Sequence, residues 1–265
     1  MSFLSVDHCE RRYSYSMKTV LQSALPFDAF APKPLPGISP LVEADWLIVD
    51  DAYAGQLALR DELVSKNSQA VIRLETTAEN AATELLDKVV SAVLARPEQD
   101  FTRSGDTITR PDGVTILIDY KVPLATLGRL VQEDFCILQK VGSEHVLTGA
   151  VLCFPASWSL SEKFRKPLVD IHVPVNGYTE DIAKRVQRLF DGVREARPLW
   201  RFNALWYDDP TLHQPRSANE RRAPVDPSTA PFFRSEKQCI LRLPVSDAVV
   251  FSIHTFVLPR ANVMP

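Results

Sequence analysis

Four stretches of the chain place apolar residues at helical spacing, at 53–64, 77–94, 124–138 and 178–196. In the second stretch, Thr77 stands where its side chain can cap a helix, and Pro97 ends the apolar pattern. The third stretch begins after Pro123 and continues through two acidic residues, Glu133 and Asp134. This spacing predicts four helices, three of them before residue 140.

Other segments carry the signals of strands and turns. Pro111-Asp112-Gly113, between two β-branched runs, indicates a hairpin over Thr107–Asp119. Residues 158–167 and 208–231 lack a regular pattern and are expected to form loops. Helices first and consecutive strands last predict an α+β protein with a largely antiparallel sheet. Apolar or alternating runs predict extended segments at 145–154, 168–175, 199–207, 232–243 and 248–258.

Proline, with 20 residues, outnumbers glycine, with 9, which favours stiff connections over a glycine-lined phosphate site. Five of the prolines fall between residues 26 and 40. We therefore expect residues 1–43 to form an extended proline-rich N-terminal segment, and residues 44–265 to form a single domain.

Charge and cysteine content bear on where the protein works. Thirty basic residues stand against 33 acidic ones, so the net charge of −3 offers no general field for nucleic acid or an anionic membrane. No run reaches the ~18 apolar residues of a membrane-spanning helix, and charged residues interrupt the N-terminus. The four cysteines lack Cys-x-x-Cys spacing and three lie in apolar segments, which favours buried free thiols over disulfides or a zinc site. We expect a cytoplasmic protein with neither a nucleic-acid nor a membrane partner.

Polar residues interrupt several apolar segments in the second half of the chain. Such residues are costly to bury unless a partner or a ligand satisfies them. A structural explanation also fits each of them: a core histidine bonded to backbone, an ion pair at a strand edge, or a surface charge ladder. The residues are His172, Arg201 with Asn203, Glu236 with Gln238 and Arg242, and His254.

Taken together, these fragments resemble a known protein family. The resemblance is to the haem-dependent oxidative N-demethylase alpha-subunit-like family, and it extends over roughly residues 26–260. Each motif is short, but their number and order make the match specific. In chain order they are Leu130–Asp134, Phe154–Trp158, Lys163, Ile171–Val175, Arg201-Phe202-Asn203, Glu236-Lys237-Gln238, Leu241–Pro244 and Val250–Phe256.

The resemblance implies a fold and an activity. The fold would be a PAS-like core, in which helices flank an antiparallel sheet. The activity would be oxidative removal of a methyl group from a small amine by a haem b protein, with release of formaldehyde. Reductase partner subunits would supply the electrons, and tetrahydrofolate could take up the one-carbon product.

The same resemblance assigns residues to the cofactor. His172, in the Ile-His-x-Pro-Val motif, would be the axial iron ligand, since neutral imidazole is a suitable haem ligand. His254 is the alternative ligand. Asn203, Lys163 and Arg242 would also face the cofactor, Arg242 either by pairing with a propionate or by orienting the catalytic carboxylate.

Two residues are expected to carry the chemistry. Glu236 would hold the substrate ammonium group and accept its proton, with Arg201 beside it as a polar group of the pocket. A haem or small-molecule sensor of the same fold, without turnover, is an alternative function. A haem-free member that binds another ligand is a third.

Overall fold

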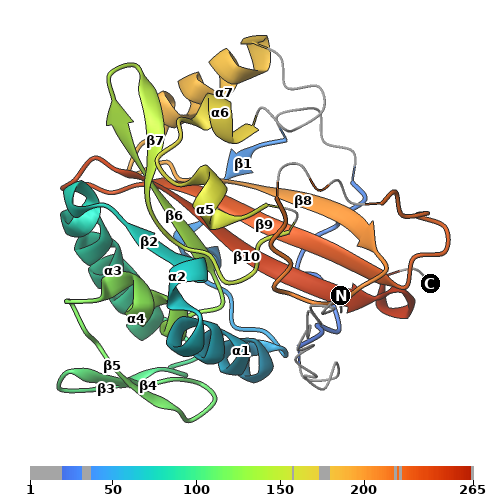
Figure 1. The fold of residues 1–265 in the computed structure, drawn as a ribbon. Helices are drawn as coiled ribbons and strands as arrows, with labels where there is room; N and C mark the ends of the chain where they lie inside the picture. The colour runs from blue at the N-terminus through green and yellow to red at the C-terminus, as the bar shows by residue number, and fades with distance from the viewer. Residues whose placement is uncertain are drawn as a thin grey trace, which may run out of the picture.

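The computed structural model describes residues 20–31, 37–156, 158–172, 180–217, 220 and 223–263, and their side chains except at residues 172 and 180–184. Within this part of the chain, a seven-stranded sheet runs in the order β1-β8-β9-β10-β6-β7-β2, with every neighbouring pair antiparallel (Figure 1). Its strands are β1 (Ser39–Pro40), β2 (Ile72–Leu74), β6 (Asp134–Val141), β7 (Glu144–Val151), β8 (Leu199–Tyr207), β9 (Phe232–Arg242) and β10 (Val249–Pro259).

A second, three-stranded sheet confirms the predicted hairpin. It consists of β3 (Thr102–Ser104), β4 (Thr107–Thr109) and β5 (Thr115–Leu117), and lies below α4 in Figure 1. In the large sheet, the long strands stand in the order β7-β6-β10-β9-β8, which is compatible with a PAS-like core. The predicted α+β class with an antiparallel sheet flanked by helices is therefore confirmed.

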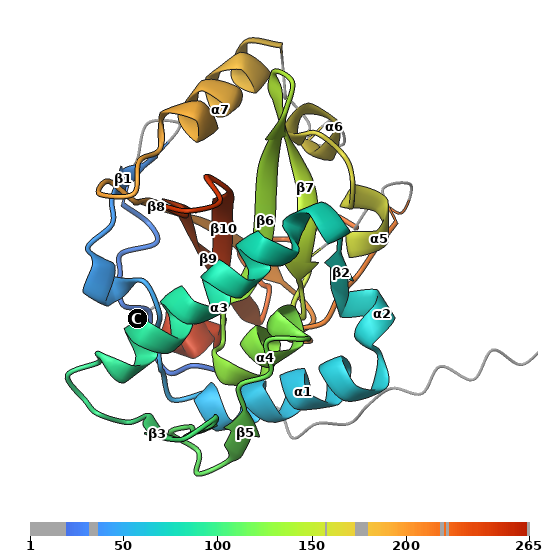
Figure 2. The same ribbon diagram turned by 90° about the vertical axis from the view of Figure 1, so that its left-hand side faces the viewer.

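Six of the described helices lie in two groups. One group, α1 (Tyr53–Lys66), α3 (Glu79–Leu94) and α4 (Pro123–Leu130), gathers on one side of the sheet (Figures 1 and 2). The other, α5 (Leu160–Lys163), α6 (Leu168–His172) and α7 (Glu180–Gly192), comes from the connection between β7 and β8. Short helical turns complete the described part, at α2 (Ser68–Val71), Glu43–Asp45, Thr76–Ala78 and Arg260–Asn262.

Each helix group packs on its own face of the sheet. We call the face toward α1, α3 and α4 the α3 face; strand side chains such as Leu241 and Val250 pack there against Leu85 of α3. We call the opposite face the α7 face; Ile240 and Ile253 pack there in one cluster with side chains from α5, α6 and α7. Successive residues of a strand point to opposite faces, so each candidate residue of β8, β9 and β10 belongs to one face or the other.

Helix α4 ends at Leu130, so the prediction of a helix reaching residue 138 is wrong. Strand β6 begins instead at Asp134, whose buried carboxylate accepts bonds from Arg60 at 2.7 Å and from the backbone amides of residues 153 and 154 at 2.7 and 2.8 Å. These bonds fix the chain between helix and strand. The first residues of β6 are buried on both faces, so the sequence there lacks the alternation that would mark a strand.

Three other local predictions are also wrong. Thr77 does not cap α3, because it lies in the helical turn before it and its hydroxyl bonds the Glu75 carboxylate. Residues 168–172, predicted to be extended, form helix α6, and the predicted loop before them contains α5. The Lys163 ammonium group donates to the carbonyl of Ile171 near the end of α6, which satisfies one of the terminal carbonyls of that helix.

The described residues of the N-terminal segment pack against the sheet. Val20 and Leu41 belong to the core, and the Gln22 side chain accepts a bond from the amide of Val257 at 2.8 Å. Residues 1–19 and 32–36 of that segment lie outside the described residues. Among the described helices, none combines the length and apolar character needed to cross a membrane.

Three cysteines confirm the prediction of buried free thiols, namely Cys136, Cys153 and Cys239. Burial raises the pKa of each to about 12, which makes the thiolate rare at neutral pH. Cys9 lies outside the described residues.

Replacing Asp134 tests the buried junction between α1, β6 and β7. Asp134→Asn should lower the free energy of unfolding by about 3–5 kcal/mol, because Arg60 then stays buried without a counter-charge. Urea denaturation followed by circular dichroism measures the loss. Glu43→Gln, which breaks the exposed pair with Lys88, is the matched control and should cost less than about 1 kcal/mol. If Asp134→Asn lowered the free energy of unfolding no more than Glu43→Gln does, this account would be contradicted.

Candidate functional site

A group of polar side chains occupies the middle of the α7 face. Glu236 on β9 stands directly between Asn203 on β8 and Thr255 on β10. Arg201, opposite Gln238, lies two residue pairs further along the same two strands and therefore on the same face. Directly paired residues of neighbouring strands project from the same face. We call the six residues Arg201, Asn203, Arg234, Glu236, Gln238 and Thr255 the Glu236 cluster.

Unsatisfied polar atoms concentrate in this cluster. In the described part of the chain, four buried side-chain nitrogen or oxygen atoms lack a hydrogen-bond partner. Three of them are in the cluster: Arg201 Nε, Arg234 Nε and Thr255 Oγ1. Buried polar groups in native proteins are nearly always bonded, so such a concentration marks a place where a ligand or ordered water completes the bonding.

The Glu236 carboxylate accepts one hydrogen bond within the described residues and can accept more. Its Oε2 accepts a bond from Gln238 Nε2 at 3.1 Å, and its Oε1 lies 3.8 Å from Arg234 Nε. The side chain is 15% exposed, so a molecule on the α7 face can reach it. A carboxylate can accept about four hydrogen bonds, which leaves Glu236 with capacity for a cationic or donor group.

Arg201 has no anionic partner among the residues that the structure describes. Its guanidinium is half-buried and makes no ion pair with the described residues. Burial lowers the pKa of Arg201 from its usual range, with no neighbouring carboxylate to offset the effect. An anionic group of a ligand would remove this cost, so Arg201 fits a carboxylate-bearing molecule.

Arg234 is a member of the cluster that the sequence analysis missed. Its Nη1 donates to the carbonyl of Leu212 at 3.1 Å and its Nη2 to that of Phe154 at 2.7 Å. Only 3% of the residue is exposed. The spacing Arg234-Ser235-Glu236 was the available signal, because residues two apart in a strand share a face.

The ends of the cluster are bounded by packed elements. Beyond Gln238, Ile240 packs with Phe190 of α7 and with Val193 just after that helix. At the other end, the bonds from Arg234 fix the loop at Leu212. The cluster therefore lies between the C-terminal end of α7 and the loop that follows β8.

Arg242 does not orient Glu236, contrary to one of the two expected roles. It donates to the carbonyls of Phe190 and Val193, each at 2.8 Å, and pairs with Asp247 at 2.8 Å. These bonds satisfy terminal carbonyls of α7 and hold the helix end to β9. The Asn203 side chain is exposed beside Glu236, and nothing in the described residues tests its expected contact with a cofactor.

The two candidate histidines lie on opposite sides of the sheet. Helix α6, which ends at His172, packs on the α7 face through Leu168 and Ile171, so the backbone of His172 is on the same side as Glu236. The side chain of His172 lies outside the described residues. Lys163 is mostly buried and anchors this helix, as described above, and burial lowers its pKa.

His254 belongs to a buried network on the α3 face. Its Nδ1 lies 2.9 Å from Glu133 Oε1, and its Nε2 lies 3.0 Å from Asp50 Oδ2. Burial alone would lower the pKa of His254, but the two carboxylates raise it to about 9. The ring is therefore an imidazolium at neutral pH, and while both bonds are made no ring nitrogen is left for iron.

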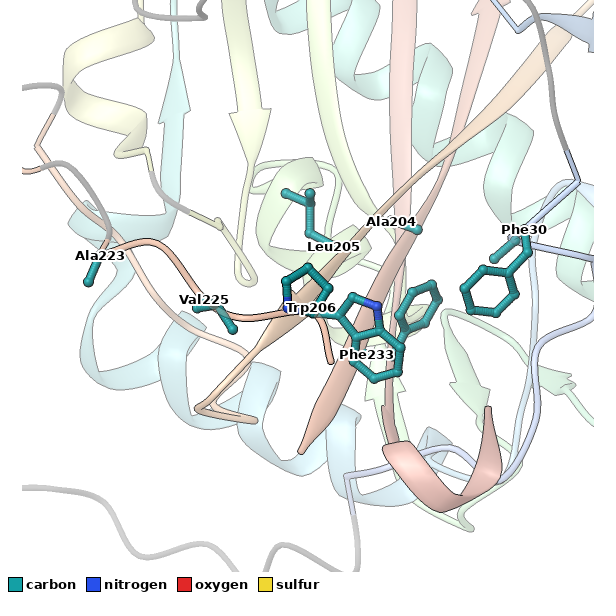
Figure 3. Close-up of a pocket in the computed structure, with 9 residues that line it drawn as sticks. Phe30, Ala204, Leu205, Trp206, Ala223, Val225 and Phe233 are labelled. Carbon is teal, nitrogen blue, oxygen red and sulfur yellow. The ribbon is translucent and has the colours of Figure 1, made fainter. Parts of the chain in front are cut away.

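An aromatic pocket lies apart from the Glu236 cluster and is lined by none of its six residues. It measures about 360 Å³ and lies beyond Asn203 along β8, where Trp206 and Phe233 pack with ring centroids 4.9 Å apart and Phe30 stacks on Phe233 at 5.3 Å. Figure 3 shows these three rings beside Ala204 and Leu205, with Ala223 and Val225 opposite. Within the described residues, no group of three or more His, Cys, Asp or Glu side chains could hold a metal ion.

A protein-family comparison agrees with the motif pattern. The model of a family described as "Haem-dependent oxidative N-demethylase, alpha subunit-like" matches residues 37–264. The match covers most of the chain, including β1, every strand of the Glu236 cluster and all three helices of the α7 face. No curated protein matches the chain.

The charged network around His254 predicts how stability depends on pH. The folded-state pKa of about 9 lies above the ordinary 6.5, so the imidazolium stabilises the fold fully below about pH 6.5, and this contribution is lost as pH rises through 9. We expect the free energy of unfolding to fall by on the order of 3 kcal/mol between pH 6.5 and 9.5.

Urea denaturation at a series of pH values measures this slope. His254→Gln cannot titrate, so its slope over the same range should be clearly smaller, although the variant is less stable at neutral pH. If the free energy of unfolding changed equally with pH in the two proteins, His254 would not be the group that loses a proton in this range.

Proposed function

The chain belongs to the haem-dependent oxidative N-demethylase, alpha subunit-like family, and on that premise we propose that it oxidises a small amine with a bound haem and releases a methyl group as formaldehyde. The observation that carries the proposal is the Glu236 cluster. It combines a carboxylate with free accepting capacity and a half-buried guanidinium that pairs with no anion of the described part of the chain, on the sheet face where α6 and α7 pack.

The described residues fit a haem in two respects. Haem b is a largely apolar plate that carries carboxylate groups, and Arg201 is a half-buried cation that no carboxylate of the described residues pairs with. On the same face, the partly exposed ring of Phe251 on β10 would suit the apolar part of the plate. We therefore propose Arg201 as the residue that holds a haem carboxylate.

His172 is the proposed iron ligand. Its backbone stands at the end of α6 on the α7 side, whereas His254 lies on the other face with both ring nitrogens bonded to carboxylates. The hold of Lys163 on the end of α6 would position the backbone that presents His172. When bound, haem supplies the activation of dioxygen that no protein side chain can provide.

Glu236 is the proposed catalytic residue. Its carboxylate would bind the ammonium form of the amine through charge and a hydrogen bond, and then accept the proton that must leave before the nitrogen can be oxidised. Gln238 fixes one carboxylate oxygen at 3.1 Å, which leaves the other directed for the substrate. Thr255, with its unpartnered hydroxyl on the same side, could bond the substrate or a water molecule beside it.

The overall reaction needs partners that supply electrons. Removal of a methyl group by dioxygen takes up an electron pair and two protons, and yields the demethylated amine, formaldehyde and water. We propose reductase subunits as the electron source and tetrahydrofolate as an acceptor of the one-carbon product. The proposed setting is the cytoplasm, where reduced donors are available.

Replacement of Glu236 tests the proposed function. The full chain is purified from cells supplied with a haem precursor and given an electron donor and a panel of N-methylamines. Glu236→Gln should lower formaldehyde release at least 100-fold, because a positioned general base typically contributes that much. Its haem absorption spectrum should stay that of the wild type, since the substitution is nearly isosteric.

A carboxylate elsewhere provides the control. Glu79→Gln, on the exposed start of α3, should leave both formaldehyde release and the spectrum unchanged. Wild-type protein that binds haem and changes its spectrum with amines, yet releases no formaldehyde, would favour the sensing module instead. Wild-type protein that binds no haem would contradict the proposal.

A further inference from the structure

Arg234 and Thr255 border Glu236 with buried donors that have no partner. Arg234 lies two residues before Glu236 on β9, and Thr255 stands directly opposite Glu236 on β10. Only 3% of Arg234 and 1% of Thr255 are exposed, and Arg234 Nε and Thr255 Oγ1 have no hydrogen-bond partner among the described residues. Arg234 Nε faces Glu236 Oε1 at 3.8 Å, which is too long for a hydrogen bond. Two unsatisfied donors therefore stand beside one carboxylate.

The Arg234 side chain is held by neutral groups. Its Nη1 donates to the carbonyl of Leu212 at 3.1 Å, and its Nη2 donates to that of Phe154 at 2.7 Å. These bonds fix the guanidinium but do not offset its charge, and among the described residues its ion pair is with Glu236. When the Glu236 carboxylate binds a substrate ammonium group, the charge of Arg234 loses that partner. A substrate that carries its own carboxylate would replace it.

We propose that the substrate is an N-methylated α-amino acid, whose ammonium group pairs with Glu236 and whose carboxylate accepts from Arg234 Nε and Thr255 Oγ1. This inference rests on the proposed function and narrows its substrate from small amines in general. The 3.8 Å between Arg234 Nε and Glu236 Oε1 favours an α-amino acid, because a single carbon separates its ammonium nitrogen from its carboxylate. A simple amine such as dimethylamine would leave both donors unsatisfied.

The difference in burial sets the direction in which such a substrate lies. The Glu236 side chain is 15% exposed, whereas Arg234 and Thr255 are almost fully buried. The carboxylate of the substrate is therefore its inner end, and the methylated nitrogen lies at Glu236, nearer to solvent. Demethylation of N-methylglycine, the smallest member of the class, takes up dioxygen, two electrons from the reductase and two protons. It yields glycine, formaldehyde and water.

Calorimetric titration of the full chain purified with haem tests the substrate class without any turnover. N-methylglycine is compared with N-methylglycinamide, which has nearly the same shape and an ammonium group but no negative charge. The acid should bind about 100-fold more tightly than the amide, because it gains two charge-assisted hydrogen bonds, each worth about tenfold in affinity. Equal affinity for the two compounds, or no binding of either, would overturn the proposal.

Replacing Thr255 tests whether the carboxylate lies at this place. Thr255→Val is nearly isosteric and removes the hydroxyl, so the preference for acid over amide should fall about tenfold, whereas Thr255→Ser should keep most of it. Thr115→Val, which breaks an exposed hydroxyl pair with Thr109, is the matched control and should leave the preference unchanged. A preference that Thr255→Val does not reduce would overturn the assignment of the carboxylate to Arg234 and Thr255.

Formaldehyde release separates this inference from the proposed function. If both hold, kcat/KM for N-methylglycine exceeds the values for dimethylamine and for the amide. If the acid is preferred in binding but no N-methyl compound yields formaldehyde, the Glu236 cluster binds amino acids and the proposed function fails alone. If dimethylamine is demethylated but N-methylglycine is not, the inference about the substrate fails alone.

Discussion

The buried carboxylate of Asp134 is the contact on which the rest of the structure depends. It joins three elements at once, because it pairs with Arg60 of α1, begins β6 and binds the amides of Cys153 and Phe154 after β7. Each partner is itself buried, so none could find a replacement in water. Through the carbonyl of Phe154, the same junction also fixes Arg234, a charged side chain of the candidate site, so the core and that site are joined by one set of hydrogen bonds.

The two faces of the sheet differ in whether their buried cations have carboxylate partners. On the α3 face, the buried cations of Arg60 and His254 each meet carboxylates at hydrogen-bond distance. On the α7 face, Arg201 makes no ion pair with any described residue, and three unpartnered polar atoms belong to the same cluster as the Glu236 carboxylate. A buried charged group costs little stability when an opposite charge pairs with it. A buried charged group without such a partner is costly unless a ligand or water supplies the missing contact. The contrast is the reason why we propose the α7 face as the functional one.

The sequence predicted this site in part. Alternation along β8 and β9 places Arg201 with Asn203, and Glu236 with Gln238, but it cannot say which residue of one strand stands opposite which residue of the next. The motifs also pointed to residues that serve the framework: Arg242 and Lys163 bond the ends of helices. The end of α4 could not be predicted, because the polar residues that stop it find their partners far away in sequence, as Asp134 does in Arg60.

The most direct test of the central claim is a crystal structure of the full chain purified with haem. The account predicts a haem on the α7 face, with His172 on the iron, a haem carboxylate bonded to Arg201 and Glu236 facing the open side of the iron. Iron bound by His254 would contradict it, since that requires the bonds to Asp50 and Glu133 to break. A haem seated in the aromatic pocket at Trp206, with Arg201 still unpartnered, would contradict it equally.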